Sequence, residues 1–316
     1  GKTAGELVSS WKPEVVFSSN TPTESQSGIL RASQSVGARF VFWCQDFYSI
    51  AVDKLVRKKI PVLGGLVGGY YKRLERKQLQ ASDHIVAITE DFKPIMVDEF
   101  GVAPDRVSAI PNWAPLGSLP RLDKDNEWAR GQGLQDCFVF LYTGTLGMKH
   151  NPELLAALAG QFRGDEKVRV VVISEGIGAD WLREEKEKRS LENLLLLPYQ
   201  PFSDLPQVLA TGDVLTGVLE EDAGIFSVPS KVLTYLCAGR PILLAVPSVN
   251  LAARIIRDEE AGLTVPPSDE EAYLAAARAI FEDDVAAGAM ADRARAYAER
   301  TFDIASIADR FEEILR

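Results

Sequence analysis

The chain has 316 residues, of which 46% are hydrophobic and 25% are charged, and its formal net charge at pH 7 is -10. This composition is typical of a globular protein, and the length exceeds what one hydrophobic core usually organises, so two domains are expected. The acidic balance argues against nucleic acid as a partner.

The cysteines and the apolar segments point to a reducing compartment. Cys44, Cys137 and Cys237 lack the spacing of metal ligands, so we interpret them as reduced thiols. We find no secretory signal pattern, and no apolar run approaches the ~20 residues that a membrane-spanning helix needs. A cytoplasmic location is therefore expected.

Short β-branched segments alternate with helical segments along the chain, which is typical of doubly wound parallel sheets. In the first part, strands are expected at residues 14–18, 40–43, 85–88 and 107–110. In the second part, they are expected at residues 138–142, 168–173, 194–197, 214–216, 242–245 and 263–265. Prolines, glycines and charges interrupt the pattern between the two parts, which predicts a linker at residues 114–134. Acidic, alanine-rich helices follow the last strand.

Residues 54–77 form a basic segment in a chain whose net charge is negative. They contain eight basic residues around an apolar and glycine-rich stretch at 60–71: Lys54, Arg57, Lys58, Lys59, Lys72, Arg73, Arg76 and Lys77. Such a segment is typical of a protein surface that faces anionic lipid at the inner side of a membrane. A solvated pair of helices around a glycine-rich turn explains the same pattern, and the sequence does not decide between the two.

Residues 228–241 indicate an anion site. Pro229 suits a first helical position, and Gly239 with Pro241 ends the helix before the next strand. The free N–H groups at the start of such a helix favour negative charge, and Lys231 next to Ser230 adds a positive charge. Phosphate is the expected ligand. The alternative is an ordinary helix in which Ser230 is a cap and Lys231 is solvated.

Several segments, in their order along the chain, resemble the retaining GT-B glycosyltransferases of family 4, and among them the subgroup that builds bacterial surface polysaccharides. The similar segments are residues 11–17, 81–89, 107–112, 142–149, 174–178 and 228–241, the last with its Pro-Ser-Lys and Ala-Gly-Arg-Pro sequences. The resemblance implies an α/β fold of two Rossmann-like doubly wound domains that face a cleft. It implies an acceptor-side domain at 1–113, a nucleotide-sugar donor domain at 135–302, and a helix at 303–316 that crosses back to the first domain.

The resemblance also implies where the donor binds. The family has two glutamates on the phosphate helix, an arginine after the first glycine of the donor domain, and a lysine that meets the diphosphate. Here Phe226 and Thr234 stand at the glutamate positions, Thr145 stands at the arginine position, and Lys149 is retained. The donor-binding residues implied are Gly144, Thr145, Lys149, Gly176, Tyr199, Phe226, Val228, Ser230, Lys231 and Thr234.

Two of these assignments have plain structural alternatives. Tyr199 offers an aromatic face to a nucleobase, or it packs against Phe202. Lys149 binds the diphosphate, or it is a solvated lysine in a loop between a strand and a helix.

On the acceptor side, the family often has a histidine beside an acidic residue after a strand. Gln45 takes the histidine position here, and Asp46 remains beside it. Asp46 could hold an acceptor or sugar hydroxyl, or it could cap the helix that follows. The candidate catalytic residues are therefore Asp46, Gln45, Lys149 and Lys231.

The function implied is transfer of a hexosyl or N-acetylhexosaminyl group, with retention, from a nucleoside-diphosphate sugar to a polysaccharide or polyprenyl-linked acceptor. We expect no cofactor and no metal, because His, Asp and Cys residues do not cluster with the spacing of ligands. A non-catalytic nucleotide-sugar or glycan-binding relative, or a GT-B sugar-nucleotide epimerase, remains an alternative. The family also has a strand and a glycine-rich loop before the segment that resembles residues 2–17, so we expect an N-terminally truncated first domain with low activity.

Overall fold

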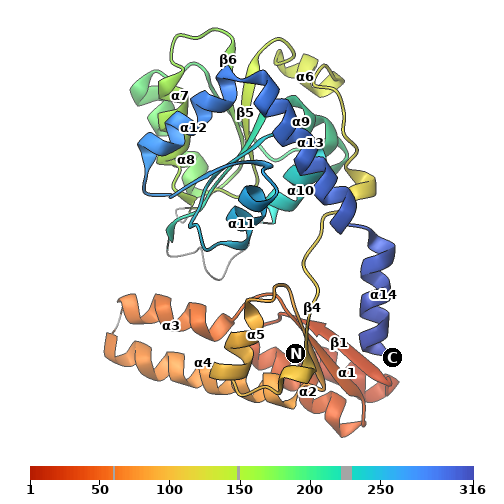
Figure 1. The fold of residues 1–316 in the computed structure, drawn as a ribbon. Coiled ribbons are helices and arrows are strands. Elements are labelled where there is room, and N and C mark those ends of the chain that lie inside the picture. Colours follow the sequence, from red (N-terminus) through yellow and green to blue (C-terminus); the bar gives the residue numbers. More distant parts are fainter. Residues whose placement is uncertain (60, 148–149, 222–229) are drawn as a thin grey trace. The chain divides into compact units, whose positions relative to one another are not determined.

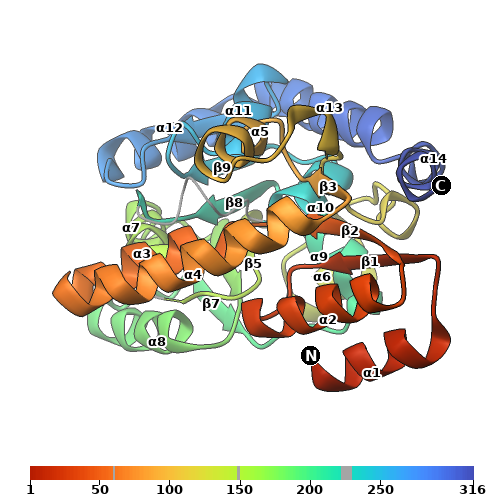
Figure 2. The same cartoon turned by 90° about the horizontal axis from the view of Figure 1, so that it is seen from below.

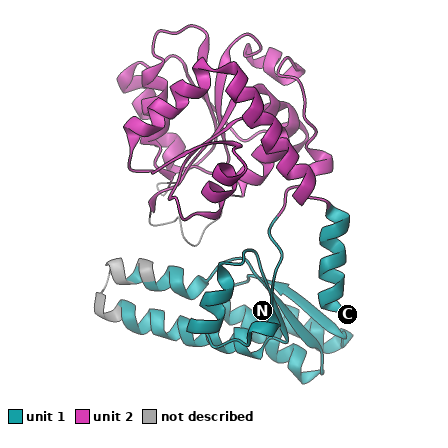
Figure 3. Cartoon of the chain, in the orientation of Figure 1, with its two compact units in different colours: residues 1–112, 304–316 teal, residues 113–303 magenta. Residues whose placement is uncertain are grey.

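The structure is a computed structural model that describes residues 1–59, 61–147, 150–221 and 230–316. It divides into two compact units, which are described separately (Figure 3). Unit 1 comprises residues 1–112 and 304–316, and unit 2 comprises residues 113–303. None of the helices that the structure describes combines the length and the apolar character that crossing a membrane requires.

Unit 1 contains a parallel sheet with the strand order β1-β2-β3-β4. Its strands are β1 Val15–Ser19, β2 Arg39–Cys44, β3 His84–Ala87 and β4 Val107–Ala109. Its helices are α1 Lys2–Trp11, α2 Thr23–Ser35, α3 Tyr48–Lys59, α4 Pro61–Ala81 and α5 Phe92–Pro94, with a π-helix at Ile95–Glu99 and a 3-10 turn at Pro104–Arg106. The expected strands are confirmed, with ends that shift by a few residues.

Helix α14, Ile304–Leu315, packs on the sheet of unit 1 (Figure 1). The Phe311 ring lies edge-on to Phe17 of β1 and to Trp43 of β2, with centroid distances of 5.5 and 5.4 Å. The Arg310 guanidinium donates a hydrogen bond of 2.5 Å to the carbonyl of Ala109, which ends β4. The C-terminal helix of the chain is therefore part of the first unit.

The glycine-rich stretch of residues 64–69 lies inside helix α4 and not in a turn, so the interpretation as a turn is wrong. Helix α4 packs along α3, as Figure 2 shows. A Cβ on Gly68 would lie 2.0 Å from Oδ1 of Asp53 on α3. Glycine at this position therefore allows the two helices to approach closely, which explains its presence within a helix.

Unit 2 contains a second parallel sheet, with the strand order β10-β9-β8-β5-β6-β7. Its strands are β5 Phe138–Thr143, β6 Val168–Ile173, β7 Leu194–Leu197, β8 Val214–Val218, β9 Ile242–Ala245 and β10 Gly262–Val265. Its helices are α6 Glu127–Gln132, α7 Glu153–Gln161, α8 Ile177–Arg189, α9 Leu205–Thr211, α10 Lys231–Ala238, α11 Leu251–Asp258, α12 Glu270–Glu282 and α13 Asp284–Thr301.

Both faces of this sheet are buried, as expected for a parallel sheet with helices on each side. Along β5, Val139 and Leu141 belong to one core cluster, while Phe140 and Tyr142 belong to the other. The near-continuous apolar runs of these strands follow from burial on both faces. Two Rossmann-like α/β units of this kind confirm the predicted fold class.

Residues 114–134, predicted as a linker, pack onto unit 2 instead. Ala114, Leu119 and Leu134 are at most 2% exposed and belong to the same core cluster as Leu141. The Asn126 side chain accepts from the Ala129 N–H at the start of α6, and Gly133 ends this helix in the left-handed region. The segment lacks a hydrophobic period because each apolar residue is buried singly, which explains its resemblance to a linker.

Candidate functional site

The strand order of unit 2 places a cavity at the carboxyl ends of β5 and β8. From β5 the chain continues through β6 and β7 on one side, and then returns to β8 on the other side of β5. The loops after β5 and β8 therefore separate, and such a switch point is where open parallel sheets bind ligands. A cavity of about 740 Å³ lies there. Its lining residues are Trp113, Ala114, Pro115, Thr143, Gly144, Thr145, His150, Ile173, Tyr199, Gln200, Leu205, Val208, Leu219, Ser230, Lys231, Leu233 and Thr234.

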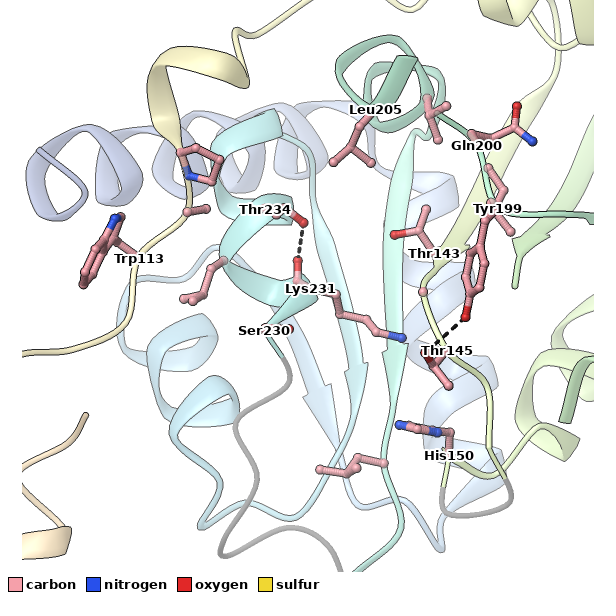
Figure 4. A pocket seen from close by; sticks show the side chains of 17 residues that line it. Trp113, Thr143, Thr145, His150, Tyr199, Gln200, Leu205, Ser230, Lys231 and Thr234 are labelled. Atoms are coloured by element: carbon pink, nitrogen blue, oxygen red, sulfur yellow. Dashed lines mark hydrogen bonds between the residues drawn. The ribbon is translucent and has the colours of Figure 1, made fainter. Parts of the chain in front are cut away.

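Helix α10 brings Lys231 to this cavity. The helix ends at Gly239, whose φ of 60° is in the left-handed region that favours glycine. Its buried Tyr235 accepts a hydrogen bond of 3.0 Å from the backbone N–H of Thr143, the last residue of β5. This bond fixes α10 against the end of the central strand. Figure 4 shows the Lys231 side chain directed from the helix start into the cavity.

The Lys231 ammonium is buried and has no hydrogen-bond partner among the residues that the structure describes. Its Nζ lies 3.6 Å from the centroid of the Tyr142 ring. A Cβ on Gly144 would lie 3.5 Å from the same nitrogen, so the glycine leaves space beside it. Burial lowers the pKa of Lys231 to about 7. The alternative of a solvated Lys231 is therefore wrong.

Ser230 and Thr234 lie on either side of Lys231 at the cavity wall. Ser230 is exposed and occupies the N-cap position of α10, as the alternative interpretation expected, but its side chain makes no cap hydrogen bond with the described residues. The Thr234 hydroxyl donates a bond of 2.8 Å to the Lys231 carbonyl (Figure 4). Its oxygen lone pairs remain available to a ligand, but not its proton.

Thr145 and Tyr199 join two loops at the opposite wall. Their hydroxyls are 3.1 Å apart, and Tyr199 remains 46% exposed within the lining of the cavity. Tyr199 therefore faces the cavity. The loop after β5 also turns at Gly144, whose backbone φ of 101° is rarely adopted by residues that carry a side chain.

Gly176 lies nearby but does not line the cavity. It precedes α8 with a φ of 103°. Two residues later, the Gly178 N–H donates to the Leu146 carbonyl at 2.9 Å and joins this loop to the loop after β5. Gly176 thus shapes the loop behind the cavity. Lys149, Phe226 and Val228 lie outside the described residues.

An apolar wall, formed by residues that no motif indicated, completes the cavity. Leu205 and Val208 come from the region of α9, and Trp113 and Pro115 come from the segment that was expected to be a linker. Next to Tyr199, Gln200 accepts a bond of 3.0 Å from the Trp128 indole. Proximity to Tyr199 is the only sequence signal that could have identified Gln200.

Gln45 and Asp46 lie in unit 1, in the loop after β2, whereas the cavity belongs to unit 2. Gln45 accepts a bond of 2.8 Å from the Asn112 amide, and Asp46 accepts from the Asn20 amide. Asp46 is exposed, but partial loss of water around its carboxyl raises its pKa, and the hydrogen bond from Asn20 lowers it in part.

Glu75, on α4, provides the carboxylate that accepts hydrogen bonds from the first turn of α3. It accepts bonds from the Ser49 hydroxyl at 2.5 Å and from the Ser49 N–H at 3.3 Å. Burial raises the pKa of Glu75 to about 7. Asp46 therefore does not need to cap this helix.

In the basic segment of residues 54–77, some of the described basic side chains are paired and others are exposed. The Lys72 ammonium pairs with Glu99 at 2.6 Å, and Arg76 donates to the Glu99 carbonyl at 2.8 Å. Arg73 and Lys77 are exposed. The side chains at positions 54 and 57–59 lie outside the description.

No group of three or more His, Cys, Asp or Glu residues that could hold a metal ion is found within the described part of the chain. The chain does contain one Asp-x-Asp sequence, at residues 123–125. Asp125 pairs with Arg130 at 2.7 Å, and Lys124 between the two acids pairs with Asp213. Neither aspartate lines the cavity.

Both units match known protein families. Residues 2–116 match the family described as glycosyltransferase family 4, and residues 137–283 match the family described as glycosyl transferases group 1.

Two curated relatives are similar in sequence. An Escherichia coli UDP-Gal:alpha-D-GlcNAc-diphosphoundecaprenol alpha-1,3-galactosyltransferase is 23% identical over 75% of this chain and 59% of the relative. A Geodermatophilus obscurus D-inositol 3-phosphate glycosyltransferase is 24% identical over 72% of this chain and 52% of the relative. The chain thus spans between half and three fifths of the length of these relatives.

Solved structures share the fold at low sequence identity. The Anabaena protein HepE, in complex with UDP, is 14% identical with a TM-score of 0.80, over 99% of this chain and 80% of that one. WaaG, a glycosyltransferase involved in lipopolysaccharide biosynthesis, is 17% identical with a TM-score of 0.70, over 99% of this chain and 94% of that one. With two parallel-sheet domains and these neighbours, the chain has the GT-B fold.

Proposed function

We propose that this chain, which carries glycosyltransferase family 4 and group 1 domains in the GT-B fold, binds a nucleoside-diphosphate sugar in the cavity of unit 2. It then transfers the hexosyl or N-acetylhexosaminyl group, with retention and without a metal ion, to a polysaccharide or polyprenyl-linked acceptor. The observation that carries the proposal is the buried ammonium of Lys231 at this cavity, which has no hydrogen-bond partner among the described residues.

An isolated buried ammonium is costly, because it loses hydration without gaining a partner. Lys231 is in this situation within the described residues, and no Asp or Glu of that part of the chain lines the cavity. An anionic ligand would supply the missing partner. The N–H groups at the start of α10 would add their positive potential to the same ligand, and phosphate is the group that such sites hold.

The rest of the cavity fits the remainder of a nucleotide sugar. Tyr199 offers a ring for the base, with Gln200 beside it, and Leu205 with Val208 forms an apolar wall. We assign the ribose to the Thr234 side of Lys231. The binding of UDP by HepE, and of UDP-glucose in a further HepE structure, supports a nucleotide sugar as the ligand class.

The chemistry follows from the charge that moves during transfer. Breaking the anomeric bond leaves negative charge on the diphosphate, and cations and N–H groups that are already aimed at this charge lower the barrier. We assign this role to Lys231 and the start of α10, with Lys149 as a second cation. We assign Gln45 and Asp46 in unit 1 to hydroxyl groups of the sugar substrates.

The acceptor class is proposed from the relatives and from the basic segment. The Escherichia coli relative acts on a polyprenyl-linked sugar, as its name states. We propose that residues 54–77 associate with anionic lipid, with Arg73 and Lys77 among the exposed cations. Vesicles that contain phosphatidylserine should retain the protein at low salt, whereas Arg73→Glu with Lys77→Glu should weaken retention. Equal retention on neutral vesicles would contradict this part.

One observation favours a second candidate, a non-catalytic nucleotide-sugar-binding relative. The described lining of the cavity contains no carboxylate, and Thr234 stands where the resemblance implies a ribose-binding glutamate. An epimerase is less well supported, because it needs carboxylates with a histidine. His150 is in the lining, but its Nδ1 already accepts from the Gly147 N–H at 2.9 Å.

Product analysis separates these functions. The protein is incubated with UDP-, GDP-, ADP- and CDP-sugars, with and without undecaprenyl-diphospho-N-acetylglucosamine, and free nucleoside diphosphate is measured. A transferase releases it only when the acceptor is present, and an epimerase releases it with water. Binding without release would support the non-catalytic candidate, and an absence of binding to all four donors would contradict both.

A further inference from the structure

A polar network occupies the carboxyl ends of the strands in unit 1. Asn20 follows β1, Gln45 and Asp46 follow β2, and Asn112 follows β4. Ligands bind at this edge of open parallel sheets. Within this network, Asn20 contacts both Gln45 and Asp46. The orientation of its side-chain amide therefore determines which atoms of the loop after β2 are available to a ligand.

The hydrogen bonds fix the orientation of the Asn20 amide. Its Oδ1 accepts a bond of 2.9 Å from the backbone N–H of Gln45, which can only donate. Its Nδ2 must therefore face Asp46, where it donates to Oδ1 of the carboxylate and to the backbone carbonyl, the latter at 3.2 Å. A flipped amide would lose all of these bonds.

This arrangement leaves one carboxylate oxygen of Asp46 available. Its Oδ1 is taken by Asn20, while Oδ2 accepts no hydrogen bond from the residues that the structure describes. The carboxyl is also at the surface, where a ligand can reach it. An ionised carboxylate only accepts hydrogen bonds, so the group that fits this oxygen is a donor such as a sugar hydroxyl.

The hydrogen bond from Asn20 also counteracts the effect of the surroundings on the pKa of Asp46. Loss of water raises the pKa of Asp46, and the Asn20 bond is what lowers it. The charge of Asp46 in turn raises the pKa of Glu75, and both carboxyls raise the pKa of the Cys44 thiol. Without Asn20, the carboxyl would lose both its fixed direction and its charge-stabilising donor.

We propose that Asn20 is a positioning residue that orients Asp46, so that Asp46 Oδ2 accepts a hydrogen bond from a hydroxyl of the sugar acceptor. The inference rests on the proposed transferase function for the identity of the ligand. The orientation and ionisation of Asp46 are properties of the protein alone, and they can be measured without any activity.

Two variants separate positioning from a merely structural role. Asn20→Ala removes both contacts of the amide. Asn20→Asp keeps an acceptor for the Gln45 N–H but places a like charge against Asp46. If Asn20 only holds the loop, alanine should be the more damaging change. If Asn20 holds the charge of Asp46, aspartate should be the more damaging change. Gln34→Ala, at an exposed position on α2, is the control.

The first readout is the pKa of Asp46 in the unliganded full chain, from carbon-13 spectra of labelled aspartate, assigned with Asp46→Asn. We expect the pKa to rise in Asn20→Ala, to rise further in Asn20→Asp, and to stay unchanged in Gln34→Ala. An unchanged Asp46 pKa in both Asn20 variants would overturn the proposal, whatever the activity of the protein.

The second readout is transfer to undecaprenyl-diphospho-N-acetylglucosamine. We expect KM for this acceptor to rise at least tenfold in Asn20→Asp, with KM for the donor within twofold of wild type. An unchanged acceptor KM would overturn the assignment to the acceptor while leaving the donor site intact. If no donor binds at all, the proposed function fails, and the pKa measurement still decides the role of Asn20.

Discussion

Replacing Lys231 by methionine should stabilise the unliganded protein. The buried ammonium has no hydrogen-bond partner among the described residues, and burial lowers its pKa from 10.5 to about 7. Methionine keeps an unbranched apolar chain over the Tyr142 ring and removes the buried charge. Exchange of a buried charged group for an apolar side chain of similar volume is often stabilising.

The magnitude and its sign follow from proton linkage. Between pH 7 and 10.5 the unfolded chain holds more protons at Lys231 than the folded chain does, so this residue makes stability rise with pH. With pKa values of about 7 folded and 10.5 unfolded, its cost is about 4 kcal/mol at pH 7 and about 2 kcal/mol at pH 9. The advantage of Lys231→Met should shrink accordingly.

Urea unfolding of both proteins at pH 7 and pH 9 tests this expectation, because other titrating groups cancel in the difference. Lys167→Met, at an exposed position of unit 2, is the matched control and should be neutral at both values. A Lys231→Met variant that is less stable than wild type at pH 7, or a difference independent of pH, would refute the reasoning. Either result would mean that the ammonium is already compensated in the unliganded protein.

Three further outcomes follow from named groups. A phosphate ligand should bind the protonated form of Lys231, so the Kd for a nucleoside diphosphate should rise about fivefold from pH 7 to pH 8. Calorimetry in buffers of different ionisation enthalpy should show that protons are taken up on binding. A Kd independent of pH would count against this. Gly144→Ala should cost about 1 kcal/mol or more of stability, because φ is 101°, and should weaken nucleotide binding, because the new methyl group would occupy space beside the Lys231 ammonium. Melting temperature and affinity check it, and wild-type affinity would argue against contact with the ligand. Glu75→Gln should gain stability relative to wild type by about 2 kcal/mol as pH rises from 5 to 7, since the folded pKa of about 7 lies above 4.5 and ionisation of the buried carboxyl destabilises the fold. Parallel urea midpoints at both pH values would contradict it.

The strands of both units were predictable because β-branched, apolar runs alternate with helical segments, and only their ends shifted. The segment 114–134 was misread, because Ala114, Leu119 and Leu134 are each buried without a period that a sequence pattern could show. The stretch of residues 64–69 was misread for a different reason. Its glycines are explained by the close approach of α3 to α4, which only the tertiary structure reveals.

The cavity in which we propose that the anion binds was predicted in part. Gly239 and Pro241 marked the end of the helix, and Lys231 lies at its start as predicted, whereas Pro229 lies outside the described residues. The burial of Lys231 could not be predicted, because it depends on Tyr142 and Gly144 at the end of a strand distant in sequence. The apolar wall carries no motif for the same reason: its members come from separate elements that meet only in the fold.

The most direct test of the central claim is calorimetric titration of UDP, GDP, ADP and CDP into the full chain with EDTA present. The account predicts that at least one diphosphate binds without metal, that Lys231→Met weakens this binding at least a hundredfold, and that Lys167→Met leaves it unchanged. Equal affinity of the wild-type and Lys231→Met proteins would contradict the assignment of the phosphate site.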